Sequence, residues 1–207
     1  PRRDDLNTIL VLGSGPIKIG QAAEFDFSGS QAVRALREDG YEVILVNSNP
    51  ATIQNDPEMA DRVYIEPLLP DTVRKILEIE KPDALLAGMG GQTALNIASE
   101  LSHDGTLERL GVELIGSDLD AIDKAEDREL FNRVCESIDL PISQAIACNS
   151  MEEVIEAAKE IGSWPILIRP AFTLGGLGGG TAFDMGQLVE IATLGLRNSR
   201  INQVLIE

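Results

Sequence analysis

The sequence predicts an α/β protein in which a doubly wound parallel sheet is followed by the first part of an α+β unit. Two observations carry this prediction. Over residues 1–118, short apolar runs alternate with stretches of helical periodicity, the order typical of parallel strands joined by crossover helices. From Asp118 onward, helical stretches arrive before any new strand, and the later strands follow one another closely. We therefore expect two domains, at residues 1–118 and 119–207.

Each of the first two predicted helices ends at a residue that stops helices. A helix over 28–39 ends before Gly40, and a helix over 71–81 ends before Pro82. A third helix is expected over 91–102. The apolar runs between these helices predict strands over residues 8–12, 42–46, 62–66, 83–87 and 112–116.

The second domain is expected to open with two helices, over 118–124 and 126–138. A later helix should begin at Ser150, because Glu153 stands three residues further on, as in a capping box. The remaining pattern suggests a small α+β unit with a largely antiparallel sheet. Its last strand reaches Glu207, so we expect the chain to be a fragment of a longer protein. The other expected elements are strands over 143–148, 165–169, 181–183 and 203–207 and a helix near 185–196.

The charge balance excludes two classes of partner. The chain has 34 acidic and 17 basic residues and a net charge of −17, which argues against nucleic acid and against an anionic membrane. No apolar run approaches the ~20 residues of a membrane span. The first apolar run is bounded by glycines and lacks a cleavage site, so it predicts a strand rather than a signal peptide. A cytoplasmic location is therefore expected.

The cysteines and the single histidine do not suggest catalysis. Cys135 and Cys148 fit no metal or redox spacing, and we expect both to be small buried or half-buried residues. His103 lies in the polar stretch SHDGT, which predicts a surface loop. A zinc site or a serine triad would need partners that the chain lacks.

The first glycine-rich stretch follows the first strand, with glycines at 13, 15 and 20. A dinucleotide fingerprint needs a glycine where Lys18 stands, and Pro16 with the later Ser28-Gly29 pair is expected to delay the helix. The turn still places backbone N–H groups at the carboxyl end of the sheet, where such folds bind ligands. This stretch could form an NAD site or a tight turn that packs against another part of the protein, and its residues favour the turn.

The second glycine-rich stretch has five glycines among residues 175–180. The spacing of Gly175 and Gly180 suits a Walker loop, but Thr181 replaces the lysine, and a strand follows instead of a helix. We expect a glycine flap between two strands whose N–H groups cradle phosphate oxygens. Arg169, at the end of the preceding strand, would add a bidentate phosphate donor. The alternative is a flexible connector, which would not need that arginine.

Four stretches of the sequence are far more distinctive than a loose glycine motif. They are VNSNPATIQNDPEMAD at 46–61, GGQTALN at 90–96, AIDKAEDR at 121–128 and RPAFTLGGLGGG at 169–180. Together they resemble the carboxyphosphate-forming, N-terminal half of the carbamoyl-phosphate synthase large-chain family, and the resemblance covers almost the whole chain. It implies a pre-ATP-grasp (Rossmann-like) domain followed by a truncated ATP-grasp domain.

The resemblance also implies an activity. In this family, ATP phosphorylates bicarbonate to carboxyphosphate, ammonia converts that intermediate to carbamate, and a second ATP yields carbamoyl phosphate for arginine and pyrimidine biosynthesis. The implied cofactors are ATP with Mg²⁺ or Mn²⁺, and the metal ligands are expected beyond Glu207. The implied partners are bicarbonate, ammonia and a glutaminase small subunit, in an oligomeric full enzyme.

The family's functional residues carry over only where the motifs match. Arg128 and Arg169 match its phosphate-contacting, catalytic arginines. Leu177 stands where a small residue is expected, which leaves the conformation of that turn open. The residues expected to line the nucleotide-binding loop are Gly175, Gly176, Gly178 and Gly179.

Other functions remain open from the sequence. Gln21, Ala22 and Glu24 are candidates for lining an ammonia path, and structural packing is the alternative role. A biotin-dependent ATP-grasp carboxylase is a second enzyme hypothesis, which the SNPATIQNDPEMAD and GGQTALN strings argue against. The third hypothesis is a nucleotide-binding module without catalysis, which the absence of the family's metal ligands from this chain favours. We expect the 207 residues alone not to turn over ATP.

Overall fold

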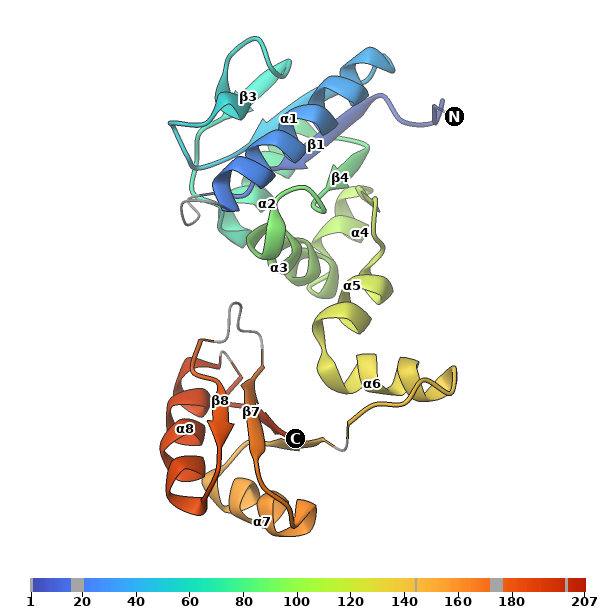
Figure 1. Ribbon diagram of the computed structural model, residues 1–207. Helices are drawn as coiled ribbons and strands as arrows, with labels where there is room; N and C mark the ends of the chain where they lie inside the picture. The colour runs from blue at the N-terminus through green and yellow to red at the C-terminus, as the bar shows by residue number, and fades with distance from the viewer. Residues whose placement is uncertain (1, 16–20, 144, 172–176, 200) are drawn as a thin grey trace. The chain divides into compact units, whose positions relative to one another are not determined.

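The structure is a computed structural model that describes residues 2–15, 21–143, 145–171, 177–199 and 201–207, without the side chains of 21–23 and 128–129. It divides into two compact units, Pro1–Ile122 and Asp123–Glu207. Figure 1 shows the helices and strands of each. No helix within the described ranges is long and apolar enough to cross a lipid bilayer.

The first unit is a five-stranded parallel sheet with the strand order β3-β2-β1-β4-β5. Its central strand β1 sends Leu10 and Leu12 into one core and Ile9 and Val11 into another. Because both faces are covered, β1 and β2 are apolar from their second residue to their last, as the strands of parallel sheets usually are. The strands are β1 Thr8–Leu12, β2 Glu42–Val46, β3 Arg62–Tyr64, β4 Ala84–Leu86 and β5 Glu113–Ile115.

Helices cover both faces of this sheet. The helix α1 contributes Val33 to the core that contains Ile9, while α2 and α3 contribute Val73 and Ile97 to the core on the other face. This arrangement confirms the doubly wound fold that the sequence predicts. The helices are α1 Gln21–Glu38, η1 Ile53–Asn55 (a single 3₁₀ turn), α2 Pro70–Glu80, α3 Gly91–His103, α4 Thr106–Leu110 and α5 Leu119–Glu126, which crosses the division between the units.

The start of α1 corrects one prediction. The sequence suggested a helix delayed until residue 28, but α1 begins at Gln21 and continues through Ser28 and Gly29. A Cβ on Gly29 would lie 2.7 Å from both amide atoms of Gln54, so the glycine permits a close tertiary approach rather than breaking the helix. The strands predicted over 62–66, 83–87 and 112–116 are also shorter than expected, at three residues each.

The second unit has a four-stranded sheet of order β6-β9-β7-β8 in which every pairing is antiparallel, as predicted. The Ser150 hydroxyl accepts from the Glu153 N–H at 3.2 Å, and the Glu153 carboxylate accepts from the Asn149 N–H at 2.6 Å, so the predicted cap of α7 is confirmed. The elements are α6 Arg128–Ser137, β6 Ile146–Cys148, α7 Met151–Ile161, β7 Ile166–Pro170, β8 Gly180–Ala182, α8 Met185–Asn198 and β9 Val204–Ile206.

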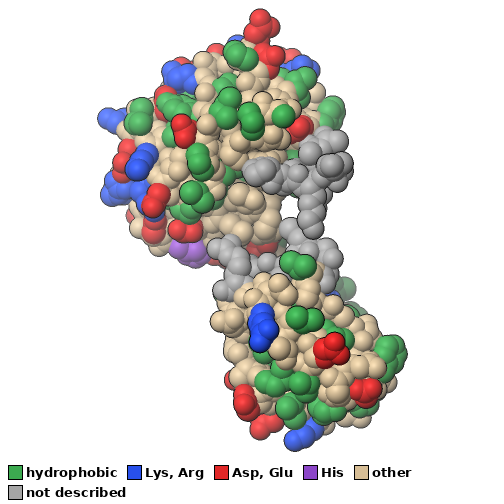
Figure 2. Space-filling model, turned by 90° about the vertical axis from the view of Figure 1, so that its left-hand side faces the viewer, with side chains coloured by type: hydrophobic (Ala, Val, Ile, Leu, Met, Phe, Trp, Pro, Cys, Tyr) green, Lys and Arg blue, Asp and Glu red, His purple; other side chains and the backbone are tan. Residues whose placement is uncertain are grey.

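The acid excess is distributed over the surface. On the face shown in Figure 2, basic side chains lie among acidic and hydrophobic ones, so the net charge of −17 does not form one block there. Several arginines are held in ion pairs, among them Arg62, which contacts both Glu42 and Glu80 at 2.8 Å. The pair with Glu42 joins two exposed side chains, and exposed pairs contribute little to stability.

Candidate functional site

The glycine turn after β1 is held by close backbone packing. The side chain of Asn47, at the end of β2, lies across Gly13, where a Cβ would come within 2.6 Å of the Asn47 Cγ atom. The Gly15 N–H donates to the Asn47 Oδ1 atom at 3.0 Å. A Cβ on Gly90, at the start of α3, would lie 2.5 Å from the Gly13 carbonyl oxygen. Three segments therefore meet without space for a side chain at the carboxyl end of the sheet.

A layer of buried polar side chains lies beside this turn, and sequence reasoning missed it. Gln54 donates from Nε2 to the Phe25 carbonyl at 2.8 Å, and Asn55 donates from Nδ2 to the Asn49 carbonyl at 2.6 Å. The signal in the sequence was the run of amide residues directly after a buried strand. Within the described residues, the buried polar atoms without a hydrogen-bond partner are Ser14 Oγ, Ser30 Oγ, Asn47 Nδ2, Gln54 Oε1 and Asn55 Oδ1.

The residues proposed to line an ammonia path lie at the start of α1. Gln21 and Ala22 belong to its first turn, but their side chains lie outside the described part of the chain, as does all of Lys18. Glu24 also lies in the first turn and is exposed.

In the second unit, two helices cover one face of the sheet. The helices α7 and α8 cover the face to which β7 contributes Ile166 and Ile168, both fully buried. Side chains alternate along a strand, so Leu167 and Arg169 point to the opposite face. Arg169 is exposed there and pairs with the Glu207 carboxylate at 3.3 Å. A guanidinium has five N–H donors, so this contact leaves most of them available to a ligand.

The strands β7 and β8 form the antiparallel hairpin that carries the glycine-rich stretch, with Ile168 opposite Gly180. Gly178 has a φ of +74°, which favours glycine, and its Cβ position would be 2.9 Å from the Asn198 Nδ2 atom. Leu177 is 60% exposed in the same turn. Gly179 is half-buried between that turn and β8, whereas Gly175 and Gly176 lie outside the described residues.

The structure brings only some of the predicted residues together. Arg169, Gly178 and Gly179 belong to one hairpin and its loop. Arg128 begins α6, and its side chain is outside the described part of the chain. The hairpin therefore supplies an arginine at the loop end of one strand and glycines directly before the other, a combination suited to binding an anion.

The cysteines and the histidine lie as expected for structural residues. Cys135 and Cys148 are free and buried, which confirms the prediction. Burial, followed by the nearby Glu153 carboxylate, raises the pKa of the Cys148 thiol to about 11, so the thiol stays protonated near neutral pH. His103 is exposed as predicted, but it is the last residue of α3 rather than part of a loop.

Two family models match the chain. The model for the carbamoyl phosphate synthase preATP-grasp domain matches residues 5–124, and the model for the carbamoyl-phosphate synthase L chain ATP binding domain matches residues 127–207.

Curated relatives match over the whole chain. The carbamoyl phosphate synthase large chains of Methanothrix thermoacetophila and Archaeoglobus fulgidus are 58% and 59% identical to it over 207 residues. The large chain of Synechocystis is 57% identical over the same length. In each case the match covers 100% of this chain and 19% of the relative, so the chain spans about a fifth of the length of these proteins.

Solved structures support the fold. The biotin carboxylase domain of 2-oxoglutarate carboxylase from Hydrogenobacter thermophilus, in complex with MgADP, ADP and bicarbonate, superposes with a TM-score of 0.73 at 18% identity, over 98% of this chain and 44% of the other. Biotin carboxylase from Campylobacter jejuni, in complex with an ATP analogue, gives a TM-score of 0.69 at 17% identity, over 98% and 45% of the two chains. At these identities the likeness concerns the fold alone.

Proposed function

The chain belongs to the carbamoyl phosphate synthase large-chain family, and from this membership we propose that its second unit binds the phosphates of ATP for the phosphorylation of bicarbonate. The observation that carries the proposal is the placement of Arg169, which is exposed at the loop end of β7 next to the glycine-rich stretch. This chain spans 19% of the length of its relative, so the proposed activity is that of a whole enzyme of which these residues form a part.

The proposed reaction begins with bicarbonate, whose carbon is a poor electrophile. A bicarbonate oxygen attacks the γ-phosphorus of ATP, ADP leaves, and one carboxylate oxygen becomes part of a phosphate leaving group. Ammonia then attacks the carbon and phosphate leaves, which gives carbamate. A second ATP phosphorylates carbamate to carbamoyl phosphate, the precursor that we propose for arginine and pyrimidine biosynthesis.

The residues of this chain would act by binding and positioning. Arg169 presents N–H donors in a planar fork that matches phosphate oxygens. The backbone at Gly178 and Gly179 would offer N–H groups from residues that have no side chain of their own. Arg128, Gly175 and Gly176 complete the proposed set. A glycine hairpin closing over the phosphates would exclude water from a mixed anhydride that hydrolyses readily.

The residues that the structure describes do not form a metal site. Among the described residues, no group of three His, Cys, Asp or Glu side chains lies close enough together to hold a metal ion. Mg²⁺ needs near-octahedral oxygen ligands, often from carboxylates and phosphates together. The metal ligands that the family resemblance implies are expected beyond Glu207, and we expect the 207 residues alone to release no ADP in the presence of bicarbonate and ATP.

Several finer features belong to the same proposal. We propose that the ammonia comes from a glutaminase small subunit and that the full enzyme is an oligomer, as the family resemblance implies. We place the reaction in the cytoplasm, where ATP and bicarbonate are both available. Glu24, with Gln21 and Ala22, remains the proposed lining of an ammonia path, and packing remains the alternative role.

The test uses a full-length large chain that contains these residues. Arg169→Ala should reduce bicarbonate-dependent ATP hydrolysis by about 10- to 150-fold, the equivalent of the ~1.5–3 kcal/mol of a charge-assisted hydrogen bond. Arg197→Ala is the matched control, since Arg197 is an exposed arginine in the last turn of α8 of the same unit. Unchanged hydrolysis in the Arg169 variant would remove this residue from the site. Nucleotide binding without any hydrolysis would favour a binding module instead.

A further inference from the structure

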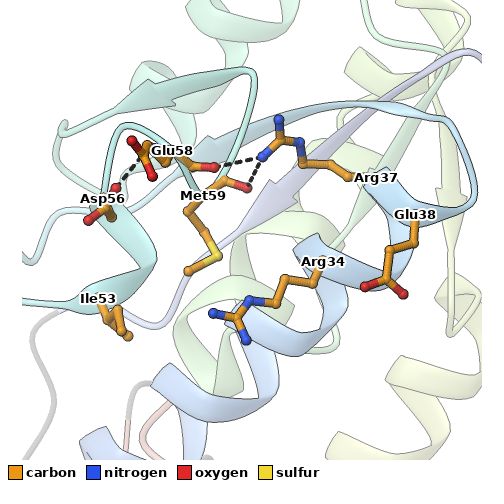
Figure 3. A pocket seen from close by; sticks show the side chains of 7 residues that line it. All are labelled: Arg34, Arg37, Glu38, Ile53, Asp56, Glu58 and Met59. Carbon is orange, nitrogen blue, oxygen red and sulfur yellow. Dashed lines mark hydrogen bonds between the residues drawn. The ribbon is translucent and has the colours of Figure 1, made fainter.

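A pocket lies in the first unit. Figure 3 shows it between α1 and the segment that follows β2. Its volume is about 560 Å³, within the range of small-molecule sites. None of its lining residues has a role in the proposed reaction. They are Arg34, Arg37 and Glu38 from α1, and Ile53, Asp56, Glu58 and Met59 from the other wall.

Two opposite charges in this pocket are available to a ligand. Arg34 and Glu38 stand four residues apart on α1, a spacing at which opposite charges commonly pair. Neither side chain has an ion pair or a hydrogen bond within the part of the chain that the structure describes. Arg37 differs, because it donates to the Glu58 carbonyl at 2.6 Å and to the Met59 carbonyl at 3.0 Å. Arg37 therefore fixes the opposite wall, while Arg34 remains open.

Apolar surface lies beside these charges. Met59 is 7% exposed, so its side chain forms a well-packed part of the wall. Ile53 is 62% exposed, so its aliphatic surface is accessible to a ligand. In Figure 3 the Arg34 side chain extends from α1 toward Met59, which brings a cation next to an apolar surface.

We propose that this pocket binds a zwitterionic α-amino acid with an apolar side chain. Its carboxylate would accept hydrogen bonds from Arg34, its ammonium group would donate to Glu38, and its side chain would pack against Met59 and Ile53. A simple anion would meet three acidic residues of the pocket and the field of a chain with a net charge of −17. A simple cation would meet the open guanidinium of Arg34. A zwitterion satisfies both charges at once.

The experiment is an NMR titration of the 207-residue chain with L-leucine. The chain has four methionines, so the Met59 methyl signal can be assigned by substitution and followed directly. We expect saturable shifts of the Met59 and Ile53 methyl signals with a Kd on the order of 1 mM. Arg34→Gln and Glu38→Gln should each raise the Kd roughly threefold to fivefold, because exposed charge contacts are weak. Arg197→Gln, an exposed arginine outside the pocket, should leave the Kd unchanged.

Two analogues separate the charges of the ligand. N-acetyl-leucine lacks the ammonium group and leucinamide lacks the carboxylate, so each should bind more weakly than leucine. In the Glu38→Gln variant, leucine and N-acetyl-leucine should bind alike. The proposal is overturned if leucine up to about 20 mM shifts neither methyl signal, if Arg34→Gln binds leucine normally, or if N-acetyl-leucine binds as well as leucine to the unsubstituted chain. The substituted side chains are exposed, and far-UV circular dichroism would verify that the variants are folded.

Discussion

The close packing of Gly90 against the turn after β1 predicts a large loss of stability in the variant Gly90→Ala. The new Cβ would lie 2.5 Å from the Ala94 Cβ atom, 2.5 Å from the Gly13 carbonyl oxygen and 2.6 Å from the Leu12 carbonyl oxygen. Two of these atoms are backbone, so they cannot move away as the end of a side chain could. Overpacking of this kind costs about 1–3 kcal/mol, and we place this rigid site at about 2–3 kcal/mol.

Gly88→Ala is the matched control from the same loop. No atom lies within 4 Å of its Cβ position, and Gly88 is exposed, so that variant should unfold with nearly unchanged free energy. Urea unfolding followed by far-UV circular dichroism measures both variants; the single tryptophan, Trp164, lies in the other unit and would not report on this one. A Gly90→Ala variant as stable as the original chain would refute the argument that this contact is rigid.

Three further predictions concern stability. Asn47→Ala removes the acceptor of the buried Gly15 N–H, so the free energy of unfolding should fall by about 1–3 kcal/mol in the same urea assay; a loss below about 0.5 kcal/mol would contradict it. Gly178→Ala should cost about 1–2 kcal/mol because φ is +74°, as followed by Trp164 fluorescence, whereas Gly186→Ala, inside α8 and without a positive φ, should be near neutral. The folded pKa of Cys148 is about 11 and its ordinary value is 9.0, so the unfolded chain loses the thiol proton first. The stabilisation of the folded chain by the protonated Cys148 thiol is intact below about pH 9. The free energy of unfolding then falls by at most about 2–3 kcal/mol as the pH rises to about 11. Cys148→Ala should flatten that decline, and an equal decline in both chains would show that Cys148 is not its cause.

Local patterns were sufficient for most of the fold. The strands β1 and β2 occupy the ranges that their apolar runs predicted, and the antiparallel second sheet followed from the spacing of its strands. The start of α1 was mispredicted because Gly29 was interpreted by its local propensity. That glycine accommodates a contact with Gln54, which lies 25 residues further along the chain and is invisible to any local window. The short helix α4 was missed because it has only five residues between Gly105 and Gly111.

The candidate sites were predictable to different degrees. Arg169 was proposed from the sequence because an arginine at the end of a strand, shortly before a glycine-rich stretch, is typical of a phosphate site, and its role stays a prediction. The pocket around Arg34 was not predictable, because Arg34 and Glu38 come from α1 whereas the apolar side chains come from η1 and the segment after it, and only the packing of α1 against η1 brings them together. The buried amide layer was hidden for a similar reason, since Asn47 and Gln54 look like surface loop residues in the sequence.

The position of β9 affects how the second unit can form during synthesis. This strand is the last in sequence, yet it lies between β6 and β7 in the middle of the sheet. On the ribosome, the hairpin of β7 and β8 emerges first, with the other edge of β7 unpaired. At ~5–20 residues per second, the wait from Pro170 to Val204 is roughly 2–7 s. During that interval the nascent chain displays an open β-edge, the feature that favours pairing with another chain, so a chaperone would have most to protect here.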